Sequence, residues 1–164
     1  MSPSSRDTNT RVEGEATVKL YREVIRKTSP EATAFLDITP DVKAVLGRSC
    51  MSEGMVLVFS RHTTAAIKIN ENESLLLSDL AHFVQRLAPK EVAYRHNDFD
   101  IRTENMTEDE CPNGHAHCQH LMLGTSETVP FAKGQLLLGR WQRIFLVELD
   151  RPREREVLVQ VQGW

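Results

Sequence analysis

The sequence predicts an α+β fold, a compact β-rich sandwich of mostly antiparallel or mixed sheet with two or three helices. Short apolar runs, several of them alternating with polar residues, recur along the chain and are typical of strands. One longer segment repeats its apolar residues at helical spacing. The 164 residues, 40% apolar and 26% charged, suit one soluble domain, which we place at 14–164 after a flexible tail at 1–13.

Eight segments carry a strand pattern and three a helix pattern. The predicted strands cover residues 16–25, 33–38, 54–60, 65–69, 128–131, 135–138, 143–149 and 156–161. Thr39, followed by a proline, predicts the N-cap of a helix that Gly47 limits to a couple of turns. Residues 73–87 are the strongest helix, with the stripe Leu76, Leu80, Phe83, Val84 and Leu87. Residues 113–123 predict a third helix, after a long polar loop at 89–113 of a length that is more often functional than idle.

Composition and motifs exclude several functional classes. With 20 Lys+Arg and 23 Asp+Glu, the formal net charge of −3 lacks the basic excess of a nucleic-acid-binding protein. No apolar run approaches the roughly 18 residues that a membrane helix needs, and the first residues do not resemble a signal peptide. The three cysteines are an odd number and do not indicate a disulfide framework. The motifs of dinucleotide, P-loop, zincin and hydrolase-elbow sites are absent. We expect a cytoplasmic protein with no nucleotide cofactor, nucleic acid or membrane partner.

Histidine is the residue type that stands out for chemistry. The six histidines are His62, His82, His96, His115, His117 and His120. On a helix His117 and His120 share a face, whereas His115 lies roughly 200° from His117, so one helix cannot offer all three to one ion. Three imidazoles and an open position describe a catalytic zinc site, with His62 or His96 as the added ligands. The alternative is that these histidines cap helices, form pairs or face solvent.

A second polar group follows the strands at 54–60 and 65–69. His62 comes after the first strand, and Asn70 and Glu71 follow the second, so these groups can converge on one pocket. Asp79 lies on the next helix, and carboxylates near imidazoles hold histidine tautomers, bind Mg²⁺ or act as bases. The alternative is that residues 70–73 only cap the helix that begins there.

A third group surrounds Trp141 and Gln142, between a glycine pair and an arginine-rich segment. The indole and the amide are suited to a flat heterocycle, and the arginines to phosphate. The alternatives are a tryptophan packed in the core and a solvated basic strand edge.

Together these segments resemble the YjbQ family, whose members are described as secondary thiamine-phosphate synthases. The matching pieces are His62-Thr-Thr-Ala65 with Asn70-Glu71, His96-Asn-Asp98, Asn113-x3-His117 running to Leu123-Gly124-x-Ser126, and Leu138-Gly139-x-Trp141-Gln142 leading to Glu148-Leu-Asp150. Their order and spacing fit over about residues 14–164, nearly the whole chain. The family pattern has Lys where Gln119 stands and Ala where His120 stands.

The resemblance implies a homotrimer with pockets near subunit contacts, acting on a small phosphorylated heterocycle. The implied reaction couples hydroxymethylpyrimidine diphosphate to hydroxyethylthiazole phosphate and releases pyrophosphate. It implies the catalytic residues His62, Glu71 and His117, and convergence of His62, His96 and His117 around a divalent metal, zinc or Mg²⁺. The binding residues that we carry over are Asn70, Asp79, Asn113, Trp141 and Gln142. The alternatives are a non-catalytic homotrimer that binds metal or a phosphorylated ligand, and a purely structural module.

Overall fold

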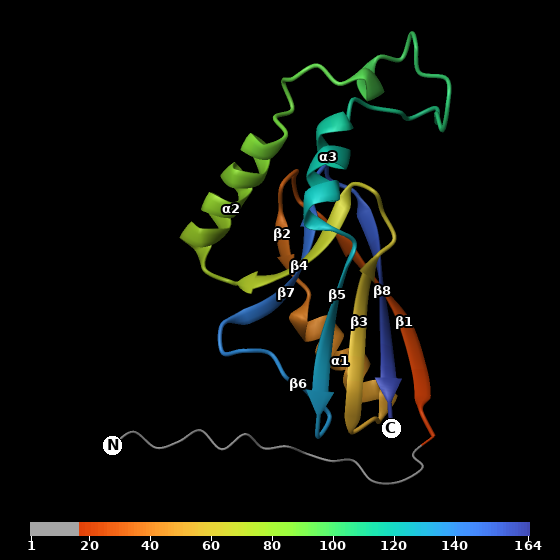
Figure 1. Cartoon of the computed structure of the whole chain (residues 1–164), viewed down its shortest axis with the longest axis vertical. Coiled ribbons are helices and arrows are strands. Elements are labelled where there is room, and N and C mark those ends of the chain that lie inside the picture. The colour runs from red at the N-terminus through yellow and green to blue at the C-terminus, as the bar shows by residue number, and fades with distance from the viewer. Residues whose placement is uncertain (1–16) are drawn as a thin grey trace.

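The computed structural model describes residues 17–164, which form two antiparallel sheets with three α-helices around them (Figure 1). The expected tail at residues 1–13 lies outside the described residues. The larger sheet has the strand order β1-β8-β3-β5-β6 and the smaller one β2-β7-β4. Every recorded strand pair is antiparallel, so the α+β prediction is confirmed in its antiparallel form.

The strand bounds follow the predicted segments closely. The larger sheet contains β1 (Lys19–Thr28), β8 (Glu154–Gly163), β3 (Glu53–Ser60), β5 (Ser126–Ala132) and β6 (Gln135–Leu136). The smaller sheet contains β2 (Phe35–Asp37), β7 (Gln142–Glu148) and β4 (Ala65–Glu71). In β8 the valines at 157, 159 and 161 are fully buried and alternate with more exposed residues, because successive side chains of a strand point to opposite faces.

Helix α1 (Thr39–Ser49) closes the core between the two sheets. Its Val42, Val45 and Leu46 are buried with valines of β3 and β8. The predicted N-cap is wrong by one residue, because Ile38 occupies that position and the Thr39 hydroxyl instead accepts the Ile144 N–H at 2.8 Å. The helix also runs past Gly47, the predicted limit, and ends before a residue in the left-handed conformation.

Helices α2 (Ser74–Leu87) and α3 (Gly114–Leu123) cover the other face of the smaller sheet. Val84 of α2 and Ala116 of α3 pack there against Phe145 of β7. The stripe predicted for α2 identifies the helix correctly but not its burial, since only Val84 is buried and Phe83 is 50% exposed. Glu73 caps α2, accepting the N–H groups of the second and third residues that follow it, as the alternative for residues 70–73 proposed.

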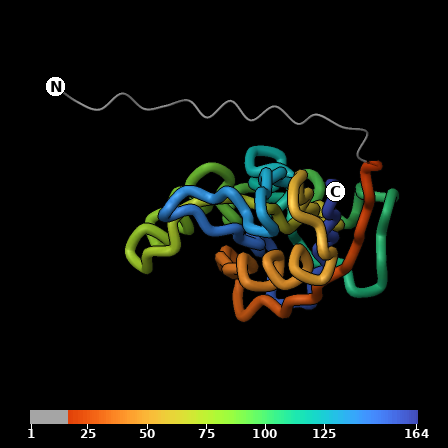
Figure 2. Tube along the Cα trace, turned by 90° about the horizontal axis from the view of Figure 1, so that it is seen from below, coloured from red at the N-terminus to blue at the C-terminus, as the bar shows by residue number. Residues whose placement is uncertain are grey.

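The segment between α2 and α3 is the predicted long loop, interrupted by a short 3-10 helix, η1 (Arg95–Asn97). Part of this loop and α2 extend from opposite sides of the sandwich (Figures 1 and 2). No helix among residues 17–164 is long and apolar enough to cross a membrane.

Candidate functional site

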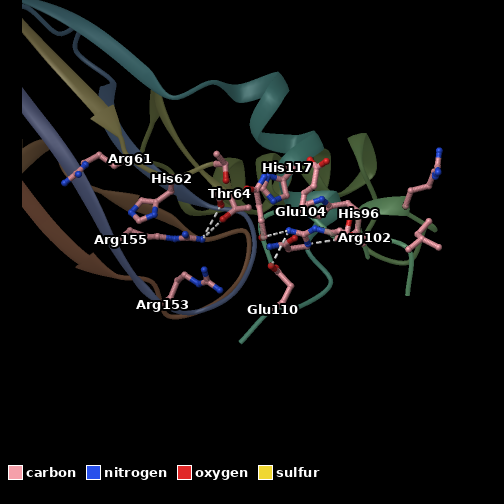
Figure 3. Close-up of a pocket in the computed structure, with 16 residues that line it drawn as sticks. Arg61, His62, Thr64, His96, Arg102, Glu104, Glu110, His117, Arg153 and Arg155 are labelled. Carbon is pink, nitrogen blue, oxygen red and sulfur yellow. Dashed lines mark hydrogen bonds and ion pairs between the residues drawn. The ribbon is translucent and has the colours of Figure 1, made fainter. Parts of the chain in front are cut away.

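A cavity of about 930 Å³ opens at one end of the sandwich. Residues that follow β3 or adjoin β8 form one side, and the long loop with the start of α3 forms the other (Figure 3). Its cationic and imidazole side chains are Arg61, Arg95, Arg102, Arg153, Arg155, His62, His96 and His117. Two glutamates, at 104 and 110, also line it, so arginine is in excess. Positive charge in a concave site favours an anionic ligand.

A buried ion pair forms the strand side of this cavity. Arg155 is 1% exposed and Glu148 is fully buried. The Arg155 Nε donates to Glu148 at 2.7 Å, and its Nη2 donates to the Thr64 hydroxyl at 3.0 Å. Glu148 further accepts the N–H groups of Leu149 and Asp150. Burial acts to raise the pKa of Glu148, but the hydrogen bond from Arg155 and those from the backbone hold it below its usual value. Arg155 is therefore a fixed group whose charge is already balanced.

His62 is held next to this pair by its own hydrogen bond. The ring Nε2 accepts the backbone N–H of Glu156 at 2.8 Å, which places the proton of the neutral ring on Nδ1. Burial lowers the pKa of His62, and the charge of Arg155 lowers it further. Because its Nε2 is occupied, His62 does not offer that nitrogen to a metal.

His96 and His117 meet on the opposite side of the cavity. Their ring centroids are 4.6 Å apart with an interplanar angle of 71° (Figure 3). The Asn97 side chain accepts the Gly114 N–H at 2.8 Å and so ties η1 to the first turn of α3. Gly114 is required there, because a Cβ would lie 2.6 Å from the Cβ of Tyr94. Burial lowers the pKa of His117, with further lowering from His96 and Arg102.

Two polar atoms of this side are buried without a hydrogen-bond partner among the described residues. They are Nε2 of His96 and Oδ1 of Asn113. Both residues line the cavity, and Asn113 is only 8% exposed. An unpaired buried polar atom costs free energy, so a bound molecule or water that pairs with these atoms is favoured.

The arginines differ in how much of their charge is already paired. Arg102 contacts Glu110 at 3.3 Å and Arg61 contacts Glu156 at 2.8 Å. Arg153 contacts Asp150 at 3.4 Å. Arg95 has no ion pair within residues 17–164. The loop therefore contributes cations that a polyanionic ligand can recruit without breaking the buried Glu148 pair.

The structure separates the other expected site residues from this cavity. Asn70, Glu71, Asp79, Trp141 and Gln142 do not line it. Residue 65, at the start of β4, follows the cavity residues 63 and 64, whereas Glu71 stands at the far end of that strand, opposite Gln142.

Trp141 is 60% exposed, and the Arg140 guanidinium lies 4.7 Å from its ring centroid. The alternative of a core tryptophan is therefore wrong. The Gln142 side chain accepts the Gly139 N–H at 2.8 Å and closes the turn before β7. These residues form a second exposed surface, distinct from the cavity within one chain.

The expected three-histidine metal centre does not form within residues 17–164. No group of three or more His, Cys, Asp or Glu is placed to hold an ion in that part of the chain. Of the three expected ligands, His96 and His117 come together, while His62 is turned to the Glu156 backbone. Within one chain, the two imidazoles that come together are fewer than the three protein ligands that a resident zinc ion takes.

Sequence reasoning missed the arginines of the long loop. Arg95 and Arg102 lie in a polar segment without strand or helix periodicity, and no motif marked them. The one signal was the length of the loop itself, which is typical of functional segments.

The family model described as UPF0047 protein YjbQ-like matches residues 23–164. A UPF0047 protein of Methanothermobacter thermautotrophicus is 38% identical over 146 residues, covering 89% of this chain and 94% of the relative. A UPF0047 protein of Synechocystis is 34% identical over 155 residues, covering 93% of this chain and 98% of the relative. A crystal structure of a YbjQ-like protein of unknown function from Sulfolobus solfataricus superimposes with a TM-score of 0.81 at 33% identity, over 90% of this chain and all of that one. The crystal structure of a YjbQ/UPF0047 family protein of Clostridium acetobutylicum superimposes with a TM-score of 0.71 at 32% identity, over 86% of this chain and 98% of that one.

Proposed function

This chain belongs to the YjbQ/UPF0047 family, and from that premise we propose that its arginine- and histidine-lined cavity binds a phosphorylated heterocycle and carries out a transfer of the thiamine-phosphate synthase type. The observation that carries the proposal is the pair of unpartnered buried atoms, on His96 and Asn113, in a cavity with five arginines. An uncharged ligand would leave Arg95 without an anionic partner and would not use the excess of arginine over glutamate in the cavity lining. A diphosphate or phosphate group pairs with several of them at once.

The reaction places simple demands on the protein. The thiazole nitrogen attacks the methylene carbon of the pyrimidine with its lone pair and forms the C–N bond. The bond from that carbon to the diphosphate oxygen breaks, and pyrophosphate leaves with the bonding electrons. The protein must therefore stabilise negative charge on the leaving group. Arg95 and Arg102 on the loop, with Arg153 opposite, are the cations placed for that role.

His117 has a positioning and hydrogen-bonding role in this proposal. Its lowered pKa keeps the imidazole neutral near pH 7, so it presents one donor and one acceptor rather than a charge. His96 lies against it and offers the unpartnered Nε2. No step runs through a metal held by the protein. Mg²⁺ enters the proposal only as a counter-ion that arrives bound to the diphosphate oxygens.

A homotrimer is part of the proposal, because Glu71 and Gln142 can act on this cavity only from a neighbouring subunit. Within one chain they stand at the far end of β4 and β7. The nearby Leu137 and Trp141 are 57% and 60% exposed, an apolar surface that a subunit contact would bury. Light scattering of the purified chain tests this part, and a monomer at all concentrations would remove Glu71 from the mechanism.

The test of activity is pyrophosphate release and product formation by pure protein given both substrates with Mg²⁺. We expect turnover in the wild type and at least a hundredfold less in His117→Ala, which removes a placed hydrogen-bonding group from the site. His82→Ala makes the same substitution at an exposed position of α2 and should not change turnover. Glu71→Gln is expected to lose turnover while the trimer persists. Saturable binding without product would favour the second candidate, a non-catalytic phosphorylated-ligand-binding trimer. Unchanged turnover in His117→Ala and Glu71→Gln would exclude this site.

A further inference from the structure

A second cavity, of about 180 Å³, lies across α3 from the first. His117 lines the first cavity, whereas His115 and Gln119 line the second, since alternate residues of a helix face nearly opposite directions. The remaining walls come from the end of α2, the residues that follow it and the turn between β1 and β2. The space is several times the ~30 Å³ that one water occupies in the liquid, so a single water does not fill it.

Two buried side chains of this cavity carry an unpartnered polar atom. His115 is 4% exposed and Gln119 is 1% exposed. Nδ1 of His115 and Oε1 of Gln119 have no hydrogen-bond partner within residues 17–164. The Gln119 amide nitrogen is already used, because it donates to the Ala88 carbonyl at 3.0 Å. That hydrogen bond fixes the orientation of the amide, so its oxygen can only accept. A donor from outside residues 17–164 is needed to form a hydrogen bond with this oxygen.

Exposed charges of opposite sign stand at the same cavity. Lys90 and Glu91 both line it and both are exposed. Burial lowers the pKa of His115, and the charge of Lys90 lowers it further, while Asp150 and Glu91 act in the opposite direction. The cavity thus combines a buried acceptor and a neutral imidazole inside with one cation and one anion outside.

The turn at this cavity is also held in an unusual conformation. Thr33 has a φ of 57°, in the left-handed region that a β-branched residue rarely adopts. Its hydroxyl accepts the Gln85 amide at 3.4 Å, and both residues line the cavity. Strain of this kind persists where surrounding contacts over-determine the backbone, and it is concentrated at ligand sites.

We propose that this second cavity binds a small zwitterion, an α-amino acid with a short side chain. Its ammonium group donates to Oε1 of Gln119 inside the cavity, and the negative charge of Glu91 at the mouth attracts it. Its carboxylate faces Lys90. Such a molecule has a few heavy atoms, which suits the volume, and it satisfies both the buried acceptor and the opposite charges at the entrance. An amine or a carboxylate alone pairs with only half of these groups.

The test is NMR titration of the full-length protein with alanine, ethylamine and propionate, following the His115 ring and Gln119 side-chain amide signals. We expect saturable shifts with alanine and at least tenfold weaker binding of ethylamine and of propionate. Gln119→Leu should weaken alanine binding at least tenfold. Gln162→Leu, the same substitution at an exposed position of β8, should leave it unchanged.

A second variant keeps the test decisive if Gln119→Leu does not fold. Lys90→Met alters an exposed residue, and it should weaken alanine and propionate binding while leaving ethylamine binding as it was. The proposal is overturned if no probe gives a saturable shift, which would mean that the cavity holds water only. It is also overturned if alanine binds equally well to wild type and Lys90→Met. Because the signals followed belong to His115 and Gln119, failure of phosphate binding in the first cavity does not affect either outcome.

Discussion

Replacing Glu148 by Gln should destabilise the protein by about 3–5 kcal/mol, because it removes one charge of a buried ion pair. One carboxylate oxygen accepts from Arg155 Nε and from the Ser29 hydroxyl, the latter at 3.1 Å. The other accepts from Arg155 Nη2 and from two backbone N–H groups. Whichever way the glutamine amide turns, its NH2 group meets a guanidinium donor, and Arg155 is left with an unbalanced buried charge.

The assay is urea denaturation at one fixed protein concentration, since subunit association makes the apparent stability concentration-dependent. The matched control is Glu156→Gln, in which the carboxylate pairs with exposed Arg26 and Arg61. That change should cost about 1 kcal/mol or less, because exposed ion pairs are screened by water. Losses of similar size in the two variants would refute the reasoning that burial decides the value of these pairs.

Three further predictions concern stability. Gly54→Ala should prevent folding or destabilise the protein severely, because the new Cβ would lie 2.0 Å from the Gln162 carbonyl oxygen. Gly47→Ala in α1 should instead stabilise the protein by about 0.5–1 kcal/mol, because the new Cβ has no atom within 4 Å. Thermal denaturation measures both effects. Phe145→Ala should cost about 3–5 kcal/mol in urea denaturation, since the ring is fully buried between sheet and helices; a loss under about 1 kcal/mol would contradict that packing. The thermal midpoint should fall as the pH drops below 6.5, before carboxylates titrate. Burial lowers the pKa values of four histidines in the folded protein, so below that pH the unfolded chain binds more protons than the folded one; these are His62, His115, His117 and His120. A midpoint that stays constant down to about pH 5 would contradict this prediction.

Local periodicity was enough to predict most of the fold. The alternating valines of β8 predict a strand with one buried face, and the spacing of apolar residues in α2 predicts a helix. The structure has both elements within a few residues of the predicted bounds. Periodicity does not predict how much of the apolar face is buried by neighbouring elements. Phe83 and Val84 are neighbours in the same stripe, yet one is half exposed and the other buried, because burial depends on which element packs against α2.

The candidate site was predictable only in part, for a related reason. The resemblance to a known family pointed to His96 and His117, and the structure brings their rings together across two separate segments. The same resemblance grouped Glu71 with them, although the direction of β4 puts that residue at the opposite end of the strand. The loop arginines have no period and no motif, so only the folded chain reveals that Arg102 faces the cavity.

Recognition of a phosphorylated ligand by the arginine-lined cavity is tested most directly by a calorimetric titration of the wild-type protein with inorganic pyrophosphate. We expect saturable binding that weakens with added salt and is at least tenfold weaker in Arg95→Met. The control is Arg22→Met, which removes the same charge from an exposed position of β1 and should bind as the wild type does. No saturable binding, or equal affinity in both arginine variants, would contradict the claim that this cavity recognises a phosphorylated ligand.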